Sequence, residues 1–359
     1  MIPTVKVIGA GSIGNHLAHG CRSRGWAVTI VDLRRDALSR TRDTIYPSRY
    51  GSWDEEITLA TPDEVASQVF DLVIVGTPPA THLGIAKAEL KNTPPQILLI
   101  EKPLSHPDGD AIREFIELAG GSPTRVLVGY NQRRKPNTSK FLEVARDPAL
   151  GKLVGLSSEM LESWDGILKA HFWMASEKDS YLAFTNQGGG ALLEHSHALN
   201  LMLHFASELG QGRPVEVSAK MEWVDHESGR YDRDSALTIT LESGLNAHVR
   251  QDLHTWPAKK EAVATFENGS VVWTMGNEAD SVTLLDHDEK PEKYWEFPKT
   301  RPDDFLGEIA HLGELLAAPE TPSNLSLEAG VQVMEVALAA VESSVSNNSV
   351  AISPLRMTR

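Results

Sequence analysis

The stretch that decides the fold is Val5-Lys6-Val7-Ile8-Gly9-Ala10-Gly11-Ser12-Ile13-Gly14. Its short apolar run leads into glycines spaced as G-x-G-x-x-G, and a helix-like stretch follows to about residue 24. A second apolar run, over residues 27–31, ends at Asp32. The order of strand, glycine turn, helix, strand and acid is typical of a βαβ unit that binds a dinucleotide, whereas the glycines alone would fit a turn in many α/β proteins.

Each residue of the glycine turn has a physical role in this prediction. Gly9 permits a tight turn, Gly11 lets the backbone approach a diphosphate, and Gly14 lets the helix pack closely on the strand. The backbone N–H groups of Ser12 and Ile13 lie at the start of the helix, where free donors and the helix dipole attract phosphate. We therefore expect all five residues to bind the cofactor.

The acid after the second strand bears on the choice of cofactor. Asp32 is placed to accept hydrogen bonds from the hydroxyls of the adenosine ribose, and its charge would repel a 2′-phosphate. Arg34 and Arg35 follow immediately and can hold such a phosphate. We therefore expect NAD as the cofactor, with NADP left open.

Further apolar runs over residues 70–75, 96–100 and 125–130 complete the pattern of the first domain. A helical pattern follows the first of them, over about residues 80–90. Strands that alternate with helices predict a doubly wound parallel sheet, which binds its ligands at the carboxyl ends of the strands. The residues expected to converge at these ends, besides the glycine turn and Asp32, are Thr77, Pro78, Glu101, Lys102 and Asn131.

Two of these strand ends carry motifs that resemble a known family. Glu101-Lys102-Pro103, and Gly76-Thr77-Pro78-Pro79 with His82 after it, are similar to motifs of the Gfo/Idh/MocA oxidoreductases, which include glucose–fructose oxidoreductase and inositol dehydrogenase. The resemblance implies that Lys102 hydrogen-bonds the reacting hydroxyl and helps proton transfer, that its bond to Pro103 is a candidate cis peptide, and that His82 belongs to the nicotinamide-side loop. A solvated surface lysine is the less favoured interpretation of Lys102.

The pattern changes after residue 130, so we expect a Rossmann domain over residues 1–130 and an α+β domain over residues 131–359. The resemblance implies that the second domain binds substrate through an open, largely antiparallel sheet flanked by helices, and that its bare face makes a homodimer or homotetramer. Segments rich in β-formers cover residues 154–161, 215–224, 236–241, 245–253, 262–266, 270–275, 281–286 and 294–297, and two helical patterns lie within residues 303–346.

A second cluster of reactive residues follows Gly188-Gly189-Gly190 in the second domain. The segment resembles the glycine-rich turn and active-site helix of the family, although common members have aspartate and then histidine four residues later. Residues three apart share a helical face, so Glu194 and His197 can face one ligand, and Asn200 continues that stripe. His197 is the candidate proton acceptor because its intrinsic pKa suits proton transfer near neutrality.

Other interpretations of this segment remain open. His195 is the rival histidine, and His197 can also be a packed core residue. Glu194, His195, His197 and His204 suggest a metal site, but their spacing lacks the strength of HExxH, so we expect no metal.

Substrate contacts are expected from Lys102, Glu194 and His197, and from four further residues. Aromatic rings stack on the apolar faces of sugars, although each tryptophan could equally pack in a core or an interface. The four are Arg133 near the last Rossmann strand, and Trp164, Trp173 and Tyr181 ahead of the glycine run.

Composition excludes several other classes of protein. The 359 residues carry a formal charge of −15, which argues against nucleic acid as a partner. Cys21 stands alone, no apolar run is long enough for a membrane span and no signal peptide is visible, so we expect a cytoplasmic protein. The leading functional hypothesis is hydride transfer between nicotinamide and a secondary alcohol or ketone of a sugar, cyclitol or nucleotide-linked sugar. The alternatives are a non-catalytic dinucleotide sensor and a redox-neutral enzyme with tightly bound NAD.

Overall fold

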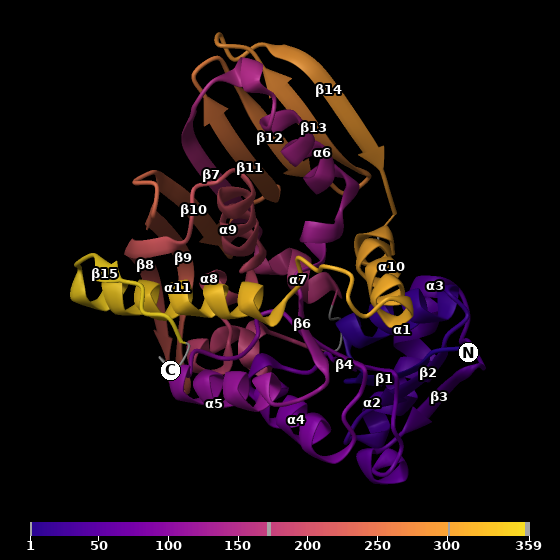
Figure 1. Cartoon of the computed structure of the whole chain (residues 1–359). Coiled ribbons are helices and arrows are strands. Elements are labelled where there is room, and N and C mark those ends of the chain that lie inside the picture. The colour runs from indigo at the N-terminus through magenta and orange to yellow at the C-terminus, as the bar shows by residue number, and fades with distance from the viewer. Residues whose placement is uncertain (1, 171–173, 301, 356–359) are drawn as a thin grey trace.

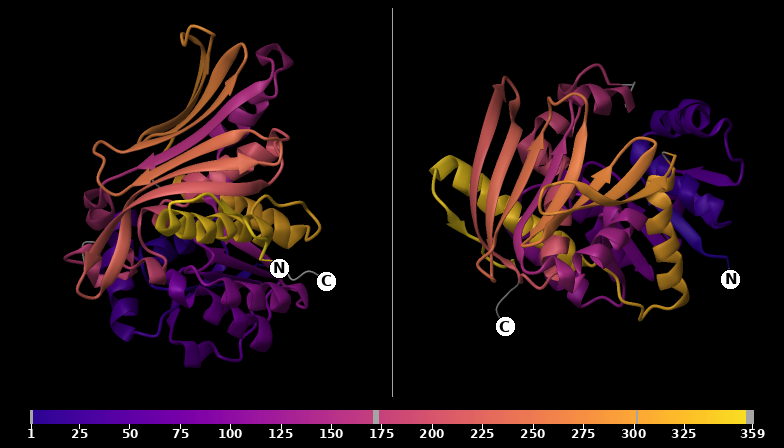
Figure 2. Two further views of the ribbon diagram at one scale, coloured as in Figure 1. Left: turned by 90° about the vertical axis from the view of Figure 1, so that its left-hand side faces the viewer. Right: turned by 90° about the horizontal axis from the view of Figure 1, so that it is seen from above.

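Two β-sheets, each covered by helices, make up the structure, which is a computed structural model (Figure 1). It describes residues 2–170, 174–300 and 302–355. The chain forms the smaller sheet first, then the larger one, and its last helices return to the first sheet (Figures 1 and 2).

The first sheet has six strands in the order β3-β2-β1-β4-β5-β6, and every neighbouring pair is parallel. The predicted doubly wound Rossmann sheet is therefore confirmed. Its strands are β1 Thr4–Ile8, β2 Ala27–Val31, β3 Ile57–Ala60, β4 Leu72–Val75, β5 Ile97–Glu101 and β6 Arg125–Gly129. Its helices are α1 Ser12–Ser23, α2 Arg35–Arg40, η1 Thr41–Ile45, α3 Tyr46–Tyr50, η2 Pro62–Val65, α4 Pro79–Asn92 and α5 Gly109–Gly120.

The second sheet has nine strands in the order β14-β13-β12-β11-β7-β10-β9-β8-β15. Within this sheet β7 and β10 are the only described neighbours that pair in parallel, so the prediction of a largely antiparallel sheet is confirmed. The strands are β7 Leu153–Leu161, β8 Pro214–His226, β9 Gly229–Leu241, β10 Asn246–Asp252, β11 Lys259–Phe266, β12 Gly269–Met275, β13 Ala279–Leu285, β14 Pro291–Pro298 and β15 Val350–Ala351.

Helices pack on one face of this sheet. In β11 the residues at every second position, Ala262, Ala264 and Phe266, are buried on the face that α6 and α9 cover. The opposite face carries polar side chains such as Glu159 and Lys220, and the proposal that it joins two copies of the chain stays a prediction. The helices that follow β6 are η3 Asn131–Arg134, α6 Pro136–Ala145, η4 Pro148–Leu150, α7 Trp164–Ala170, η5 Glu177–Asp179, η6 Tyr181–Ala183, η7 Thr185–Gln187, α8 Ala191–Glu194, α9 His197–Glu208, α10 Asp303–Ala317 and α11 Leu327–Ser346.

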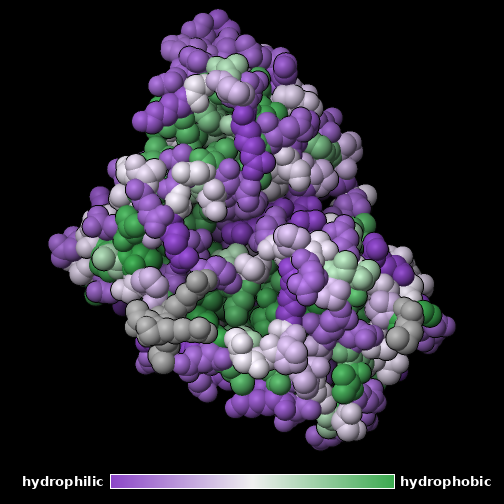
Figure 3. All heavy atoms as spheres, in the orientation of Figure 1, coloured by the Kyte–Doolittle hydropathy of each residue, from purple (hydrophilic) through white to green (hydrophobic). Residues whose placement is uncertain are grey.

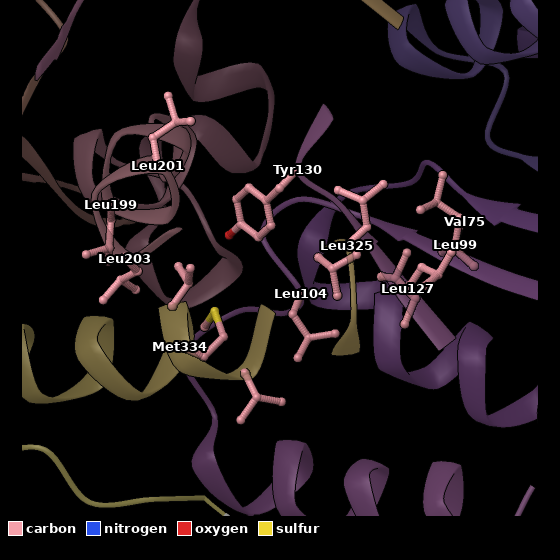
Figure 4. Packing of buried hydrophobic residues seen from close by; sticks show 14 of the residues in the cluster. Val75, Leu99, Leu104, Leu127, Tyr130, Leu199, Leu201, Leu203, Leu325 and Met334 are labelled. Carbon is pink, nitrogen blue, oxygen red and sulfur yellow. The ribbon is translucent and has the colours of Figure 1, made fainter. Parts of the chain in front are cut away.

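The two last helices join the second sheet to the first. Helix α10 packs on α1, and α11 packs on β6, where the backbone N–H of Val128 donates to the oxygen of Leu325 at 2.8 Å. Figure 4 shows Tyr130 between Leu199 of α9 and the leucines of the Rossmann strands, with Met334 of α11 beneath it. One apolar core therefore runs through both sheets, and the division at residue 130 stays a proposal.

Several elements were not predicted from the sequence. The helical run from α2 to α3 was not expected because residues 35–50 are largely polar, and strand β3, helix α5 and strand β15 were not expected either. Strand β9 begins at Gly229 rather than at residue 236, since buried Tyr231 and Asp232 continue its pairing with β8.

Hydrophilic residues cover most of the face in Figure 3, and hydrophobic residues show only in smaller areas. Of the helices that the structure describes, none is long and apolar enough to cross a membrane.

Candidate active site

The glycine turn has the close approaches that its sequence predicts. Gly9 has a φ of +112°, and a Cβ there would lie 2.6 Å from the oxygen of Gly76. A Cβ on Gly14 would lie 2.0 Å from the oxygen of Gly9, so both positions require glycine. No atom lies within 4 Å of a Cβ built on Gly11, which leaves this backbone open to a ligand.

Asp32 is fixed beside this turn by two backbone donors. Its carboxylate accepts hydrogen bonds from the N–H of Ala10 and the N–H of Arg34, both at 2.9 Å. The guanidinium of Arg35 pairs with Glu64 at 2.9 Å, while Arg34 is exposed. Of the two arginines, Arg34 is therefore the better placed to reach a cofactor ribose or its phosphate.

The loop after β4 is tied to the motif after β5 by a histidine. Thr77 is half-buried and Pro78 is exposed, but His82 is fully buried, with Nε2 2.7 Å from the oxygen of Thr77 and Nδ1 3.0 Å from the oxygen of Pro103. Burial lowers the pKa of His82 to about 4, so the ring is neutral and donates to one of these carbonyls. His82 therefore joins the two loops, and its predicted contact with the cofactor stays a prediction.

Lys102 joins the two sheets at the carboxyl end of β5. Its ammonium donates to the backbone oxygen of Glu194 at 2.8 Å and lies 3.3 Å from Oε1 of the same residue. The hydroxyl of Tyr181 donates to Oε2 of Glu194 at 2.9 Å. The structure therefore brings together three of the predicted site residues, Lys102, Tyr181 and Glu194. The peptide bond from Lys102 to Pro103 is cis, as the resemblance implied.

The electrostatics of this group favour the ionised form of Glu194. Burial alone raises the pKa of Glu194, but the charges of Lys102 and His195 and the hydrogen bond from Tyr181 bring it below its usual value. Burial and the neighbouring carboxylate hold the pKa of Tyr181 well above its usual value, so its hydroxyl stays protonated. Glu194 thus fixes the lysine on one side and is itself held by the tyrosine on the other.

The glycine run before Glu194 is shaped by a residue that the sequence did not reveal. Asp232 of β9 is buried and accepts a hydrogen bond from the N–H of Leu192 at 2.7 Å, in the first turn of α8. Gly190 has a φ of +87°, and a Cβ on it would lie 2.0 Å from Oδ1 of Asp232. A Cβ on Gly189 would lie 2.2 Å from the oxygen of Tyr181. The glycines therefore let Asp232 and Tyr181 approach the start of the helix.

The expected active-site helix is interrupted, which corrects the prediction of one continuous stripe. Helix α8 ends at Glu194 and α9 begins at His197. The oxygen of Glu194 accepts from Lys102, while the N–H of Ala198 donates to the oxygen of His195 instead. Asn200 is buried and accepts from Arg133 at 2.7 Å, so it does not continue the stripe toward a ligand.

His197 is half-buried and stands against Tyr130, with the ring centroids 5.6 Å apart in an edge-to-face arrangement. Burial, followed by the charge of Lys102, holds the pKa of His197 well below its usual value. Its Nδ1 has no hydrogen-bond partner among the described residues. A neutral imidazole whose buried Nδ1 has no hydrogen-bond partner among the described residues can accept a proton. The rival His195 is buried, and its Nε2 also lacks a partner in the described part of the chain.

The structure places the other predicted residues differently. The guanidinium of buried Arg133 in η3 bonds Asn200 of α9 and the oxygen of Asn324, the latter at 2.9 Å. Its predicted contact with a substrate stays a prediction. Trp164 packs on Tyr231 at a ring separation of 4.6 Å, in a small apolar cluster, as a core residue does. Trp173 lies outside the described residues.

Two predicted cofactor residues lie close to α10. Asn131 donates to the oxygen of Asp304 at 3.0 Å. Glu101 is buried, which raises its pKa to about 7, and both carboxylate oxygens of buried Glu308 lack a hydrogen-bond partner among the described residues. The carboxyl end of β5 thus faces a second buried acid that the sequence analysis did not single out.

The comparisons with known proteins agree with this geometry. Residues 4–130 match the model of an oxidoreductase family with an NAD-binding Rossmann fold, Gfo/Idh/MocA. The resemblance to the Gfo/Idh/MocA oxidoreductases is therefore confirmed over residues 4–130, and so is the expectation of a nicotinamide cofactor. No match to the chain was found among curated proteins.

Solved structures resemble the whole chain. A levoglucosan dehydrogenase in complex with NADH and levoglucosan is 17% identical with a TM-score of 0.77, and the match covers 99% of this chain and 100% of that one. The myo-inositol 2-dehydrogenase from Lactobacillus plantarum is 15% identical with a TM-score of 0.75, over 98% and 100%. GenD2 from gentamicin A biosynthesis, in complex with NAD, is 18% identical with a TM-score of 0.73, over 98% and 97%. At this identity the likeness shows a shared fold.

Proposed function

We propose that this protein catalyses reversible hydride transfer between nicotinamide and a secondary alcohol or ketone of a sugar, cyclitol or nucleotide-linked sugar. The observation that carries the proposal is the position of Lys102. This lysine directly follows strand β5, and Glu194 of helix α8, which packs on the second sheet, bonds its ammonium. Tyr181 of η6 in turn donates to Glu194. The likeness in fold to dehydrogenases of levoglucosan and of myo-inositol supports a polyhydroxylated substrate.

NAD⁺ would be held by the glycine turn and Asp32 and would supply the acceptor for the hydride that leaves the alcohol carbon. Lys102 hydrogen-bonds the alcohol oxygen and stabilises the negative charge that develops there as the O–H bond breaks. The hydroxyl proton passes to neutral His197, and the products are the ketone, the reduced cofactor and one proton. Glu194 holds the ammonium of Lys102 in position, while Tyr181 fixes Glu194.

The test measures reduced cofactor at 340 nm across a panel of sugars, cyclitols and nucleotide sugars. Lys102→Met should lose turnover by at least about a hundredfold while its affinity for NAD⁺ stays near that of the wild type. Lys91→Met, which removes an exposed lysine of α4, is the matched control and should leave both unchanged. Near wild-type turnover by Lys102→Met would overturn the mechanism.

The same panel distinguishes the other two functions. Tight NAD⁺ binding without turnover of any substrate would identify a sensor. A cofactor that stays bound through desalting and is not consumed would identify a redox-neutral enzyme. Either result would reject the dehydrogenase proposal.

A further inference from the structure

The open end of helix α1 has an arginine beside it that is remote in sequence. Helix α1 has Gly11 at its N-cap, without a side-chain cap, and no acid in its first turn. Its first N–H groups are therefore left for the diphosphate of the dinucleotide. Arg49 of α3 donates to the oxygen of Ser12 from Nη1 and to its Oγ from Nη2, both at 2.8 Å.

We propose that Arg49 is a diphosphate-binding residue of the NAD site, which orients the hydroxyl of Ser12 and adds a positive charge beside the first turn of α1. The contact is bidentate, so the planar guanidinium has a fixed orientation relative to Ser12. Since Ser12 is the first residue of the helix, the charge lies on the same turn whose N–H groups receive phosphate.

The segment that carries Arg49 is anchored to the glycine turn itself. Thr41 donates from Oγ1 to the oxygen of Ala10 at 2.6 Å, and buried Asn15 of α1 donates to Oγ1 of Thr41 at 3.2 Å. These contacts fix the helical run from α2 to α3 against the loop that approaches the diphosphate. Arg49 is therefore held at the site before a ligand arrives.

Aromatic contacts hold the other end of the same run. The hydroxyl of Tyr50 lies 2.6 Å from Nδ1 of His16, and the ring of His19 stacks on that of Tyr50 with centroids 3.6 Å apart. Both histidines belong to α1. Because the residue next to Arg49 is packed on α1, binding requires little ordering of the arginine, and its charge is delivered at a low entropic cost.

The overall charge of the protein makes this contribution necessary. The chain carries a formal charge of −15, which repels an anionic cofactor at long range. Asp32 adds a further carboxylate at the adenosine end of the same site. A cation next to the phosphates offsets both effects where the negative charge of the dinucleotide is concentrated.

Binding of cofactor fragments to the whole protein tests the proposal by calorimetry or NMR titration. Arg49→Met should weaken the binding of ADP and of NAD⁺ by about tenfold, as expected for loss of a charge-assisted contact. The affinity for adenosine should stay within about twofold of the wild-type value. The substitution should also reduce the dependence of ADP affinity on salt concentration. Arg42→Met is the matched control, because Arg42 is an exposed arginine in η1 of the same helical run and pairs with its neighbour Asp43. This variant should change none of these values.

Two further variants separate binding from folding. Arg49→Lys keeps the charge and should recover much of the ADP affinity, while Ser12→Ala should weaken ADP less than Arg49→Met does. Unchanged ADP affinity in Arg49→Met would overturn the proposal. An equal loss for adenosine and ADP would also overturn it, because that result means a structural role. None of these measurements depends on the substrate, so they stand apart from the test of the proposed function.

Discussion

The ammonium of Lys102 lies 2.8 Å from the backbone oxygen of Glu194 and 3.3 Å from its Oε1. One lysine thus bonds both the main chain and the side chain of Glu194, the last residue of helix α8, which packs on the second sheet. The same contact takes the carbonyl that would otherwise continue α8 into α9. The hydrogen bond that positions Lys102 is therefore also the contact that interrupts the helix.

Removal of the charge of Glu194 should impair the chemical step. In Glu194→Gln the amide keeps the size of the side chain and can still accept from Tyr181, but it no longer pairs with the Lys102 ammonium. We expect kcat to fall by about a hundredfold, with NAD⁺ affinity unchanged. Glu117→Gln, at an exposed position of α5, is the control for loss of one carboxylate. Equal kcat values for the two variants would show that the pair plays no part in turnover.

The rate of alcohol oxidation should depend on pH through His197. Burial and Lys102 disfavour the imidazolium, so the pKa of His197 lies well below 6.5 and the ring is already the free base at pH 6.5. We expect kcat/KM to stay level from about pH 6.5 to 8 and to fall only at lower pH. Lys260→Met removes another charge that lowers this pKa, so its acid limb should move to higher pH. A wild-type inflection at pH 6.5 or above would contradict the assignment.

Gly190 should not tolerate a side chain. In Gly190→Ala the left-handed backbone is strained and the new Cβ meets Oδ1 of Asp232 at 2.0 Å. We expect a loss of about 3 kcal/mol in the free energy of unfolding, together with loss of turnover. Gly210→Ala separates the two causes, because Gly210 also has a positive φ, of +71°, but has no atom within 4 Å of its Cβ position. Gly210→Ala should lower the free energy of unfolding by about 1 kcal/mol. Denaturant titration of both variants would compare the two losses.

Asp32 should set the preference for NAD over NADP. Asp32→Asn keeps an oxygen that can accept from the backbone donors of Ala10 or Arg34 but removes the charge that faces a 2′-phosphate. We expect the ratio of the NADP⁺ to the NAD⁺ dissociation constant to fall by about tenfold. Asp36→Asn, at an exposed position of α2, should leave the ratio unchanged. A wild-type protein that already binds both cofactors equally would reject this role for Asp32.

Local patterns account for what the sequence predicted well. The glycine turn, Asp32 and the apolar strands are encoded within short windows, so the Rossmann sheet could be derived from them. Lys102 could be singled out because it follows directly on a buried strand. The roles of Asp232 and Arg49 could not, since their contacts join residues 40 and 37 positions apart and leave no local spacing to recognise.

Burial explains where two of the predicted site residues lie. A histidine at a motif position can bond backbone carbonyls as readily as a cofactor, and both ring nitrogens of His82 lie close to backbone oxygens. The buried guanidinium of Arg133 likewise donates to the side chain of Asn200. In the sequence, Asn200 stands out only because it lies three residues after His197 on the predicted helix. Side-chain chemistry identifies the candidates, but the competing internal partners become visible only in three dimensions.

The return of the chain to its first sheet limits how this protein can be recombined. Ile309 of α10 fills the space beside Gly20 of α1, where a Cβ would lie 2.9 Å from it, and Val128 of β6 lies as closely against Gly330 of α11. An exchange of residues 131–359 with those of a relative would therefore replace one wall of the Rossmann sheet as well as the proposed substrate-binding residues. A chimera that changes substrate choice alone must retain α10 and α11 with the Rossmann sheet and exchange only the β-rich block between them.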